Sequence, residues 1–148
     1  MNYTGTRLSE EVMGHARAEA FRLRHNVIEP AHLVLGLLGV REGVASSVLD
    51  SMAIDREEIR GLLEDLLPAG EATPAANELP FSEAGAAILR DWMAEADKER
   101  VPYLTTGQLL LAVFENHAWP RDEGLGPEDL RRRVVQTAAA SAEHEDLA

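Results

Sequence analysis

The chain contains one sequence pattern twice, and this duplication constrains the fold more than any other feature. Ala18-Glu19-Ala20, followed by the apolar run 32–38, returns 76 positions later as Ala94-Glu95-Ala96, followed by the run 108–114. Each copy carries apolar faces that it can bury only partly by itself. The repeat therefore predicts a duplicated helical unit whose two copies pack against each other.

The two copies are also expected to begin alike, with Leu8-Ser9-Glu10 in the first and Phe81-Ser82-Glu83 in the second. Serine is a preferred N-cap residue, because its hydroxyl accepts a hydrogen bond from a free N–H group of the first turn. We therefore expect Ser9 to cap the first helix, with the Glu10 and Glu11 carboxylates near the positive end of the helix dipole.

Helical spacing and capping patterns divide the first copy, about 6–67, into four helices. These expected helices cover about 9–25, 30–38, 44–52 and 55–67. Proline, glycine, threonine and alanine dominate 68–80, which is the composition of a linker.

The second copy, about 81–140, repeats this order with one exception. Its expected helices cover about 82–99, 105–114 and 126–139. Between them, 116–124 contains Pro120 and Gly124 and has little helical periodicity, so we expect the third helix to be reduced to a turn. A polar and mobile tail, 141–148, should follow. No segment alternates apolar and polar residues long enough to indicate a strand.

These patterns predict an all-α single domain of two pseudo-symmetric repeats of about four helices each, with a degenerate third helix in the second repeat. The length of 148 residues suits one domain. A formal net charge of -12 argues against nucleic acid as the main partner, because phosphate binding depends on clustered Lys and Arg. The chain has no cysteine and no apolar run of roughly 18 residues, so we expect a cytoplasmic protein that does not use a membrane.

The five histidines and 26 acidic residues raise the question of a metal or acid-base site. His15, His25 and His32 lack the i, i+4 pairing of a helical zinc motif, and no Gly-x-Ser-x-Gly nucleophile motif occurs. We therefore expect no catalytic residue, cofactor or metal, and expect His32 to brace the helix junction through its ring nitrogens. A small hydrolase or metal-dependent enzyme that uses His and acid clusters remains the alternative.

The motif that most resembles a known family begins with His25-Asn26 and Ile28 and continues through His32-Leu33, Leu35-Gly36-Leu37-Leu38 and the later Gly43-Val44-Ala45. It resembles the Clp repeat, which forms the N-terminal domain of the Hsp100 unfoldases, ClpC-type proteins most closely. The resemblance covers about 6–139. It implies a non-catalytic module of two four-helix units that receives substrates or adaptors for an ATP-driven unfoldase and its protease.

The chain departs from this family pattern in three places. ClpC-type domains carry a Glu before the His of each second helix, and that pair of acids is associated with recognition of phosphorylated arginine. Here the equivalent residues are Ala31 and Gly107, and the second His is Gln108. A phosphate-binding P-loop is also missing, since the only lysine is Lys98. We therefore expect a freestanding homologue without an ATPase module and with doubtful phosphoarginine recognition.

The resemblance also indicates where partners could bind. Phe81 aligns with a phenylalanine that in ClpC-type domains helps form a surface pocket for cyclic peptides, and Tyr3 lies near the N-terminal aromatic that partners it. We expect Leu79, Pro80 and Phe81 to lie beside Tyr3 and to form a seam for protein or peptide ligands. Phe81 could instead be a hydrophobic staple of its own helix. Trp119 could be either a partner anchor or a lid over the gap left by the missing helix.

These partners would be Clp unfoldase or protease components, or their substrates. The function expected from the resemblance is therefore that of an accessory or adaptor of the ATP-dependent Clp protease system, or of a stand-in that sequesters its ligands.

Overall fold

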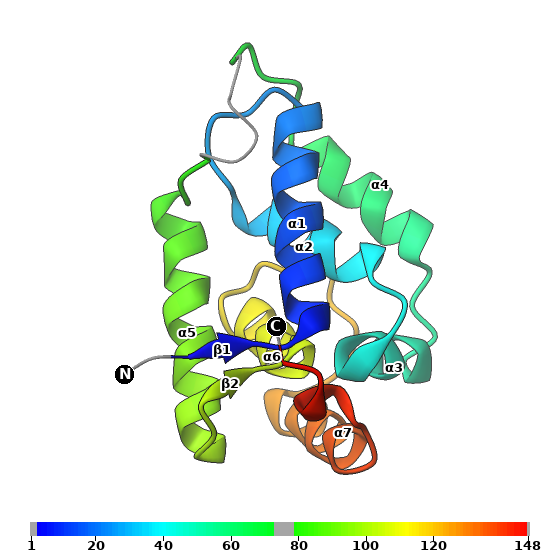
Figure 1. Cartoon of the computed structure of the whole chain (residues 1–148). Helices are drawn as coiled ribbons and strands as arrows, with labels where there is room; N and C mark the ends of the chain where they lie inside the picture. Colours follow the sequence, from blue (N-terminus) through cyan, green and yellow to red (C-terminus); the bar gives the residue numbers. More distant parts are fainter. Residues whose placement is uncertain (1–2, 73–78, 148) are drawn as a thin grey trace.

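The computed structural model describes residues 3–72 and 79–147, and in these ranges it contains seven α-helices (Figure 1). The first repeat contains α1 (Arg7–Arg22), α2 (Pro30–Gly39), α3 (Gly43–Ser51) and α4 (Arg56–Leu66). The second contains α5 (Glu83–Glu99), α6 (Thr106–Glu115) and α7 (Pro127–Ala139). Two short strands, β1 (Thr4–Gly5) and β2 (Tyr103–Leu104), and a 3-10 turn, η1 (Glu143–Glu145), complete the described elements. The predicted all-α double repeat is confirmed.

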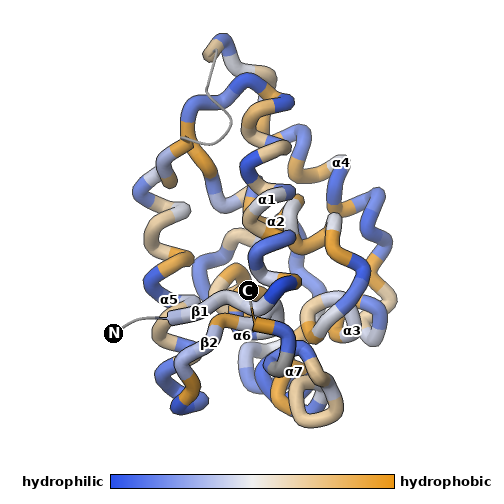
Figure 2. The backbone as a smooth tube through the Cα atoms, in the orientation of Figure 1, coloured by the Kyte–Doolittle hydropathy of each residue, from blue (hydrophilic) through white to orange (hydrophobic). Residues whose placement is uncertain are grey.

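The hydrophobic core forms around α2 and α6, which lie between the other helices (Figure 1). Residues 32–38 of α2 and 106–113 of α6 are all buried, as expected for helices that are apolar on every side. The outer helices are amphipathic. On α4, for example, Ile59 and Leu63 are buried, and hydrophilic and hydrophobic colours both occur along the helix in Figure 2.

The N-terminal segment of each repeat pairs with a loop of the other repeat. Strand β1 is parallel to β2, with Gly5 opposite Leu104, and an isolated parallel bridge joins Ile28 to Phe81. Gly5 and Phe81 are 76 positions apart, as are Ile28 and Leu104, so the two pairings are equivalent. Each strand has only two residues, which is too short for alternation to reveal it in the sequence.

The caps of α1 and α5 correct the predicted alignment of the repeat starts. Thr6, not Ser9, caps α1: its hydroxyl accepts from the Ser9 N–H at 3.1 Å, while the Ser9 hydroxyl donates to the Leu104 carbonyl. Ser82 caps α5 by accepting from the Gly85 N–H at 3.0 Å. Thr6 and Ser82 are 76 positions apart, so the predicted pairing of Leu8-Ser9-Glu10 with Phe81-Ser82-Glu83 was wrong by three residues.

The connection between α6 and α7 contains no helix, as predicted for the third helix of the second repeat. Of the predicted linker 68–80, residues 73–78 lie outside the described part of the chain. Its first residues are bound to the end of α1, because the Gly70 N–H donates to the Leu23 carbonyl and the Ala72 N–H to the Arg24 carbonyl. In the described ranges, no single helix is long and apolar enough to span a membrane. Helices α2 and α3 reach that length and composition together, but the chain bends by 85° between them.

Candidate functional site

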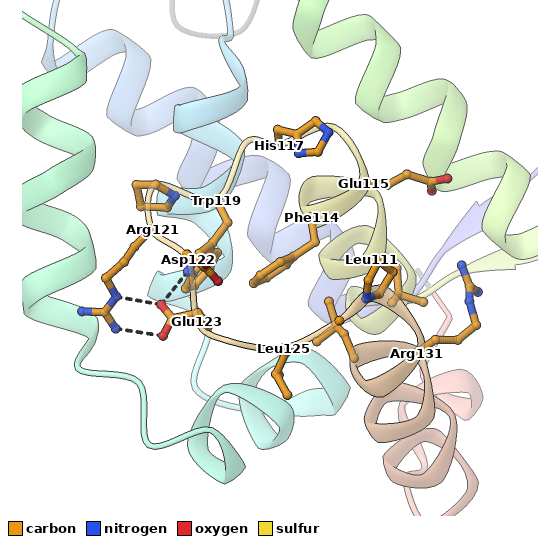
Figure 3. Close-up of a pocket in the computed structure, with 14 residues that line it drawn as sticks. Leu111, Phe114, Glu115, His117, Trp119, Arg121, Asp122, Glu123, Leu125 and Arg131 are labelled. Carbon is orange, nitrogen blue, oxygen red and sulfur yellow. Dashed lines mark hydrogen bonds and ion pairs between the residues drawn. The ribbon is translucent and has the colours of Figure 1, made fainter.

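A pocket of about 620 Å³ lies along the segment that stands in place of the missing third helix (Figure 3). Its walls come from the end of α6, the connection 116–126 and the start of α7. Apolar side chains form much of its lining: Leu111, Phe114, Trp119, Leu125 and Leu130. The irregular connection leaves these apolar side chains facing the pocket.

Trp119 forms part of the pocket wall and not an exposed anchor. Trp119 is 7% exposed, and its indole ring stacks on the Phe114 ring with the ring centroids 5.1 Å apart. The indole N–H donates to a Glu123 carboxylate oxygen at 2.9 Å, which satisfies its polar atom. This placement agrees with the interpretation of Trp119 as a lid, and its role in contacting a partner stays a prediction.

The connection is held in place by Arg121. Its guanidinium donates to both Glu123 oxygens, at 2.9 and 3.1 Å (Figure 3). It also donates to Glu58 on α4, at 2.6 Å. The hydrogen bond to Glu123 is the main cause that raises the pKa of Arg121. The Arg121–Glu58 ion pair therefore joins the pocket wall to α4 of the first repeat.

The second wall is fixed by Arg131 of α7. Its guanidinium donates to both oxygens of Glu95, at 2.6 and 2.9 Å, and Lys98 donates to the same carboxylate at 3.2 Å. Burial alone would raise the pKa of Glu95, but the hydrogen bonds from Arg131 and Lys98 lower it overall. The first repeat has an equivalent ion-pair cluster. Glu19 lies 76 positions before Glu95 and forms ion pairs with Arg22 and Arg60.

The rim of the pocket carries negative charge. Arg121 and Arg131 are paired with carboxylates, whereas Glu115 and Asp122 are exposed at the pocket. Asp122 accepts one hydrogen bond, from the Gly124 N–H at 2.8 Å, which leaves its charge uncompensated by a cation. An apolar floor with an acidic rim suits a peptide that carries apolar and basic side chains.

His32 braces the junction before α2, and this confirms the prediction. Its Nδ1 accepts from the Glu29 N–H at 2.8 Å, and its Nε2 lies 2.9 Å from Nδ1 of His25. Burial first, and His25 second, lower the pKa of His32 to about 4. In the second repeat Gln108 does the same work, because its Oε1 accepts from the Thr105 N–H at 3.0 Å. The residues that the structure describes include no group of three His, Asp or Glu arranged to hold a metal.

The predicted seam between Tyr3 and Phe81 does not form. The Tyr3 hydroxyl donates to Asp97, near the end of α5, whereas Phe81 directly precedes the start of this helix. Asp97 lies fourteen positions after Glu83 in α5, a distance of about 21 Å along the helix axis. The N-terminal segment pairs with β2 and not with the start of α5, which the sequence did not reveal.

The other residues of the predicted seam are partly accounted for by the fold. Leu79 and Phe81 are half-buried against the core, and the Phe81 ring lies over Gly85 in the first turn of α5. Pro80 is exposed, and its carbonyl accepts from the Ile28 N–H at 2.8 Å. Binding of a partner by Leu79, Pro80 and Phe81 stays a prediction.

Gly107 is buried, and its surroundings leave no room for the glutamate of ClpC-type domains. A Cβ at this position would lie 2.5 Å from Cγ1 of Val44 and 3.0 Å from Cγ1 of Val134. An acidic side chain here would require α3 and α7 to move. At Ala31, the equivalent position of the first repeat, the residue is half-buried.

Sequence reasoning missed Glu143. The tail was predicted to be mobile, but the described part folds back and buries this carboxylate against Thr6, Val44 and Thr106. The signal could not be found locally, because the donors come from three distant segments.

Comparison with known proteins agrees with this fold. The model of the Clp repeat (R) N-terminal domain family matches residues 5–120. The chain is 32% identical over 133 residues to the chloroplastic chaperone protein ClpC1 of Oryza sativa subsp. japonica, covering 86% of this chain and 14% of that protein. It is 30% identical over 112 residues to the ATP-dependent Clp protease ATP-binding subunit ClpC of Staphylococcus saprophyticus, covering 76% of this chain and 13% of that protein.

Among solved structures, a complex of the ClpV N-domain with a VipB peptide has a TM-score of 0.76 at 17% identity, covering 95% of this chain and 90% of that chain. The chain spans about one seventh of the length of the two ClpC relatives. The match over 5–120 and the shared fold lead to one conclusion: the chain belongs to the Clp repeat N-terminal domain family.

Proposed function

We propose that the chain is a non-catalytic module that binds proteins or peptides. We also propose that it serves the ATP-dependent Clp protease system as an accessory or adaptor, or by sequestering ligands of that system. The observation that carries this proposal is the apolar pocket with an acidic rim between α6, 116–126 and α7. The peptide complex of a ClpV N-domain and the names of the ClpC relatives support it.

The occupant of this pocket is an unfolded or extended peptide with large apolar side chains next to Lys or Arg. The apolar lining provides the affinity, because Leu125, Phe114 and Leu111 lose water on binding. Glu115 and Asp122 select basic neighbours, and the net charge of -12 attracts such peptides over longer distances.

The alternative, a small hydrolase or metal-dependent enzyme, would need histidines that are free to react. His25 and His32 are already hydrogen-bonded. Nδ1 of His25 lies 2.9 Å from Nε2 of His32, and Nε2 of His25 lies 2.8 Å from the Pro68 carbonyl. This geometry supports a structural role for both rings and favours the binding module.

A peptide titration tests the binding part of the proposal. A labelled peptide of alternating Leu, Phe and Lys should bind the wild-type chain, and Leu125→Glu should weaken binding at least tenfold. The new carboxylate would have to be desolvated beneath the ligand, which costs several kcal/mol. Val135→Glu is the matched control, since Val135 is 53% exposed on α7 and lies outside the pocket. Equal binding by the two variants, with both folded, would contradict the pocket as the site.

A reconstituted degradation assay tests the link to Clp. Increasing amounts of the chain are added to a ClpC unfoldase and its protease degrading an unfolded model substrate. An adaptor should speed degradation, a sequestering module should slow it, and Leu125→Glu should remove either effect. A rate that does not change at any concentration would contradict the Clp role and leave peptide binding standing.

A further inference from the structure

A carboxylate pocket lies at the N-termini of α3 and α6, away from the pocket described above. Glu143 fills it: Oε1 accepts from the Val44 N–H at 3.0 Å and the Thr106 hydroxyl at 2.6 Å. Oε2 accepts from the Thr106 N–H at 2.7 Å and the Thr6 hydroxyl at 2.9 Å. The residue is only 5% exposed. The four donors to its two oxygens, two backbone N–H groups and two threonine hydroxyls, are all neutral.

The surroundings of this carboxylate are specific for an anion. First-turn N–H groups have no partner inside their own helix, and two helix dipoles point their positive ends at the same oxygens. The Thr106 hydroxyl accepts from the Ala45 N–H at 3.1 Å, so its hydrogen remains for Glu143. Gly43 has a φ of 91°, and a Cβ there would lie 2.6 Å from Oε1 of Glu143. Glycine at this position therefore leaves room for the ligand oxygen.

The rest of the C-terminal segment is held by a backbone hydrogen bond, from the Arg7 N–H to the Asp146 carbonyl at 2.6 Å, and by exposed side chains. Asp146 accepts from the Arg7 guanidinium at 2.6 Å, but both side chains are nearly half exposed. Leu147 forms one bridge with Thr6 and is 50% exposed, and the His144 ring stacks on Tyr103 at a centroid distance of 6.0 Å. Exposed ion pairs contribute little, so Glu143 provides the main side-chain attachment of the segment. A segment held by one buried group can open locally without unfolding the helices.

The equivalent position in the other repeat lacks the groups that bind this carboxylate. The residue equivalent to Thr106 is Pro30, which has no N–H to donate, and the described part of the second repeat has no helix equivalent to α3. Only one of the two equivalent places can therefore bind a carboxylate in this way, and the C-terminal segment of the same chain occupies it.

We propose that the segment 141–147 is a displaceable internal ligand of a carboxylate-binding pocket formed by Thr6, Val44 and Thr106, and that an acidic peptide presented by another molecule binds there when the segment leaves. The segment itself defines the chemistry of that peptide: a glutamate that inserts between the two helix N-termini, with further acidic residues beside Arg7. The pocket is independent of the one along 116–126, so each can fail without the other.

The test uses the full chain and a labelled peptide with the sequence of residues 141–147. Wild-type protein should bind this peptide weakly, because its own segment occupies the pocket. Glu143→Gln should bind it at least tenfold more tightly, and a peptide with Gln in place of its first Glu should bind neither protein. Glu71→Gln, at an exposed acidic position in the linker, is the control and should bind like wild type.

Hydrogen exchange gives a second readout. The Val44 and Thr106 amides should exchange faster in Glu143→Gln and slow again when the peptide is added. If Glu143→Gln does not fold, Asp146→Asn decides the matter, because it loosens the segment outside the pocket and should raise peptide affinity two- to fivefold. The proposal would be overturned if wild type bound the peptide as tightly as folded Glu143→Gln or Asp146→Asn, or if peptide binding did not protect these two amides.

Discussion

The pH dependence of stability should reveal the buried ring of His32. Glu29 N–H donates to Nδ1, so in the folded protein the proton of the neutral ring is on Nε2, facing Nδ1 of His25. Protonation of Nδ1 would set two donors against each other and place a charge in a residue that is fully buried. Burial and His25 lower the pKa of His32 from 6.5 to about 4, and the negative charge of Glu19 opposes this only in part.

The sign of the effect follows from proton binding. Between pH 6.5 and 4 the unfolded chain binds a proton at His32 and the folded chain does not, so stability falls as the pH falls. The stabilisation is fully present above pH 6.5 and is lost toward pH 4. At 1.36 kcal/mol per pKa unit, the lowering of the His32 pKa from 6.5 to about 4 corresponds to about 3 kcal/mol.

The substitution that isolates this effect is His32→Gln. Gln108 shows that glutamine at this helix position caps equally well, so the variant should keep its fold and lose the titrating group. Urea denaturation of both proteins between pH 7.5 and 4 should show that the stability of wild type relative to His32→Gln declines by about 3 kcal/mol. His15→Gln, at an exposed ring, should follow wild type. A difference between wild type and His32→Gln that stays constant with pH would refute this reasoning.

Further substitutions test three features: the core, the ion pair of Glu95 and the expected partner contact at Phe81. Leu35→Ala and Leu111→Ala remove equivalent buried side chains, 1% and 5% exposed, and each should cost about 2–5 kcal/mol in urea denaturation; an unchanged midpoint for either would contradict the repeat alignment. Arg131→Met leaves the buried Glu95 carboxylate with Lys98 alone and should cost about 2–3 kcal/mol, whereas Arg132→Met, in an exposed pair, should cost less than about 0.5 kcal/mol; similar losses would mean that burial of Glu95 is unimportant. Phe81→Ala should weaken peptide binding by about 1–3 kcal/mol with the fold intact if Phe81 is a partner contact. A destabilised variant that binds normally while folded would show instead that Phe81 is a staple of α5.

The helices of this chain were predictable because their signals are local. The apolar runs of α2 and α6, the proline that opens α2 and the Asp55 cap of α4 each act within a few residues of the structure they specify. The loss of the third helix in the second repeat was predictable for the same reason, since proline and glycine interrupt helical periodicity directly.

Features that depend on distant partners could not be predicted. Thr6 and Ser9 are equally suitable caps by residue type, and the choice of Thr6 follows from the pairing of the preceding residues with β2. The same pairing places Tyr3 at the far end of α5 from Phe81. The burial of Glu143 requires donors from three segments, none of which marks the tail in the sequence.

The orientation of Trp119 could not be predicted either, because a tryptophan in an irregular segment can face either solvent or the core. Its stacking on Phe114 and its hydrogen bond to Glu123 depend on how the connection folds back over α6. The pocket beside it is therefore a property of the tertiary structure, although the sequence indicated where the helix is missing.

The most direct test of the account is a nuclear magnetic resonance titration of the labelled chain with the apolar and basic peptide. If the pocket along 116–126 is the binding site, shift changes should concentrate at Leu111, Trp119, Leu125 and Leu130, including the Trp119 indole N–H, and should disappear in Leu125→Glu. Shift changes confined to Tyr3 or to Leu79, Pro80 and Phe81, or the same changes in Leu125→Glu as in wild type, would contradict it.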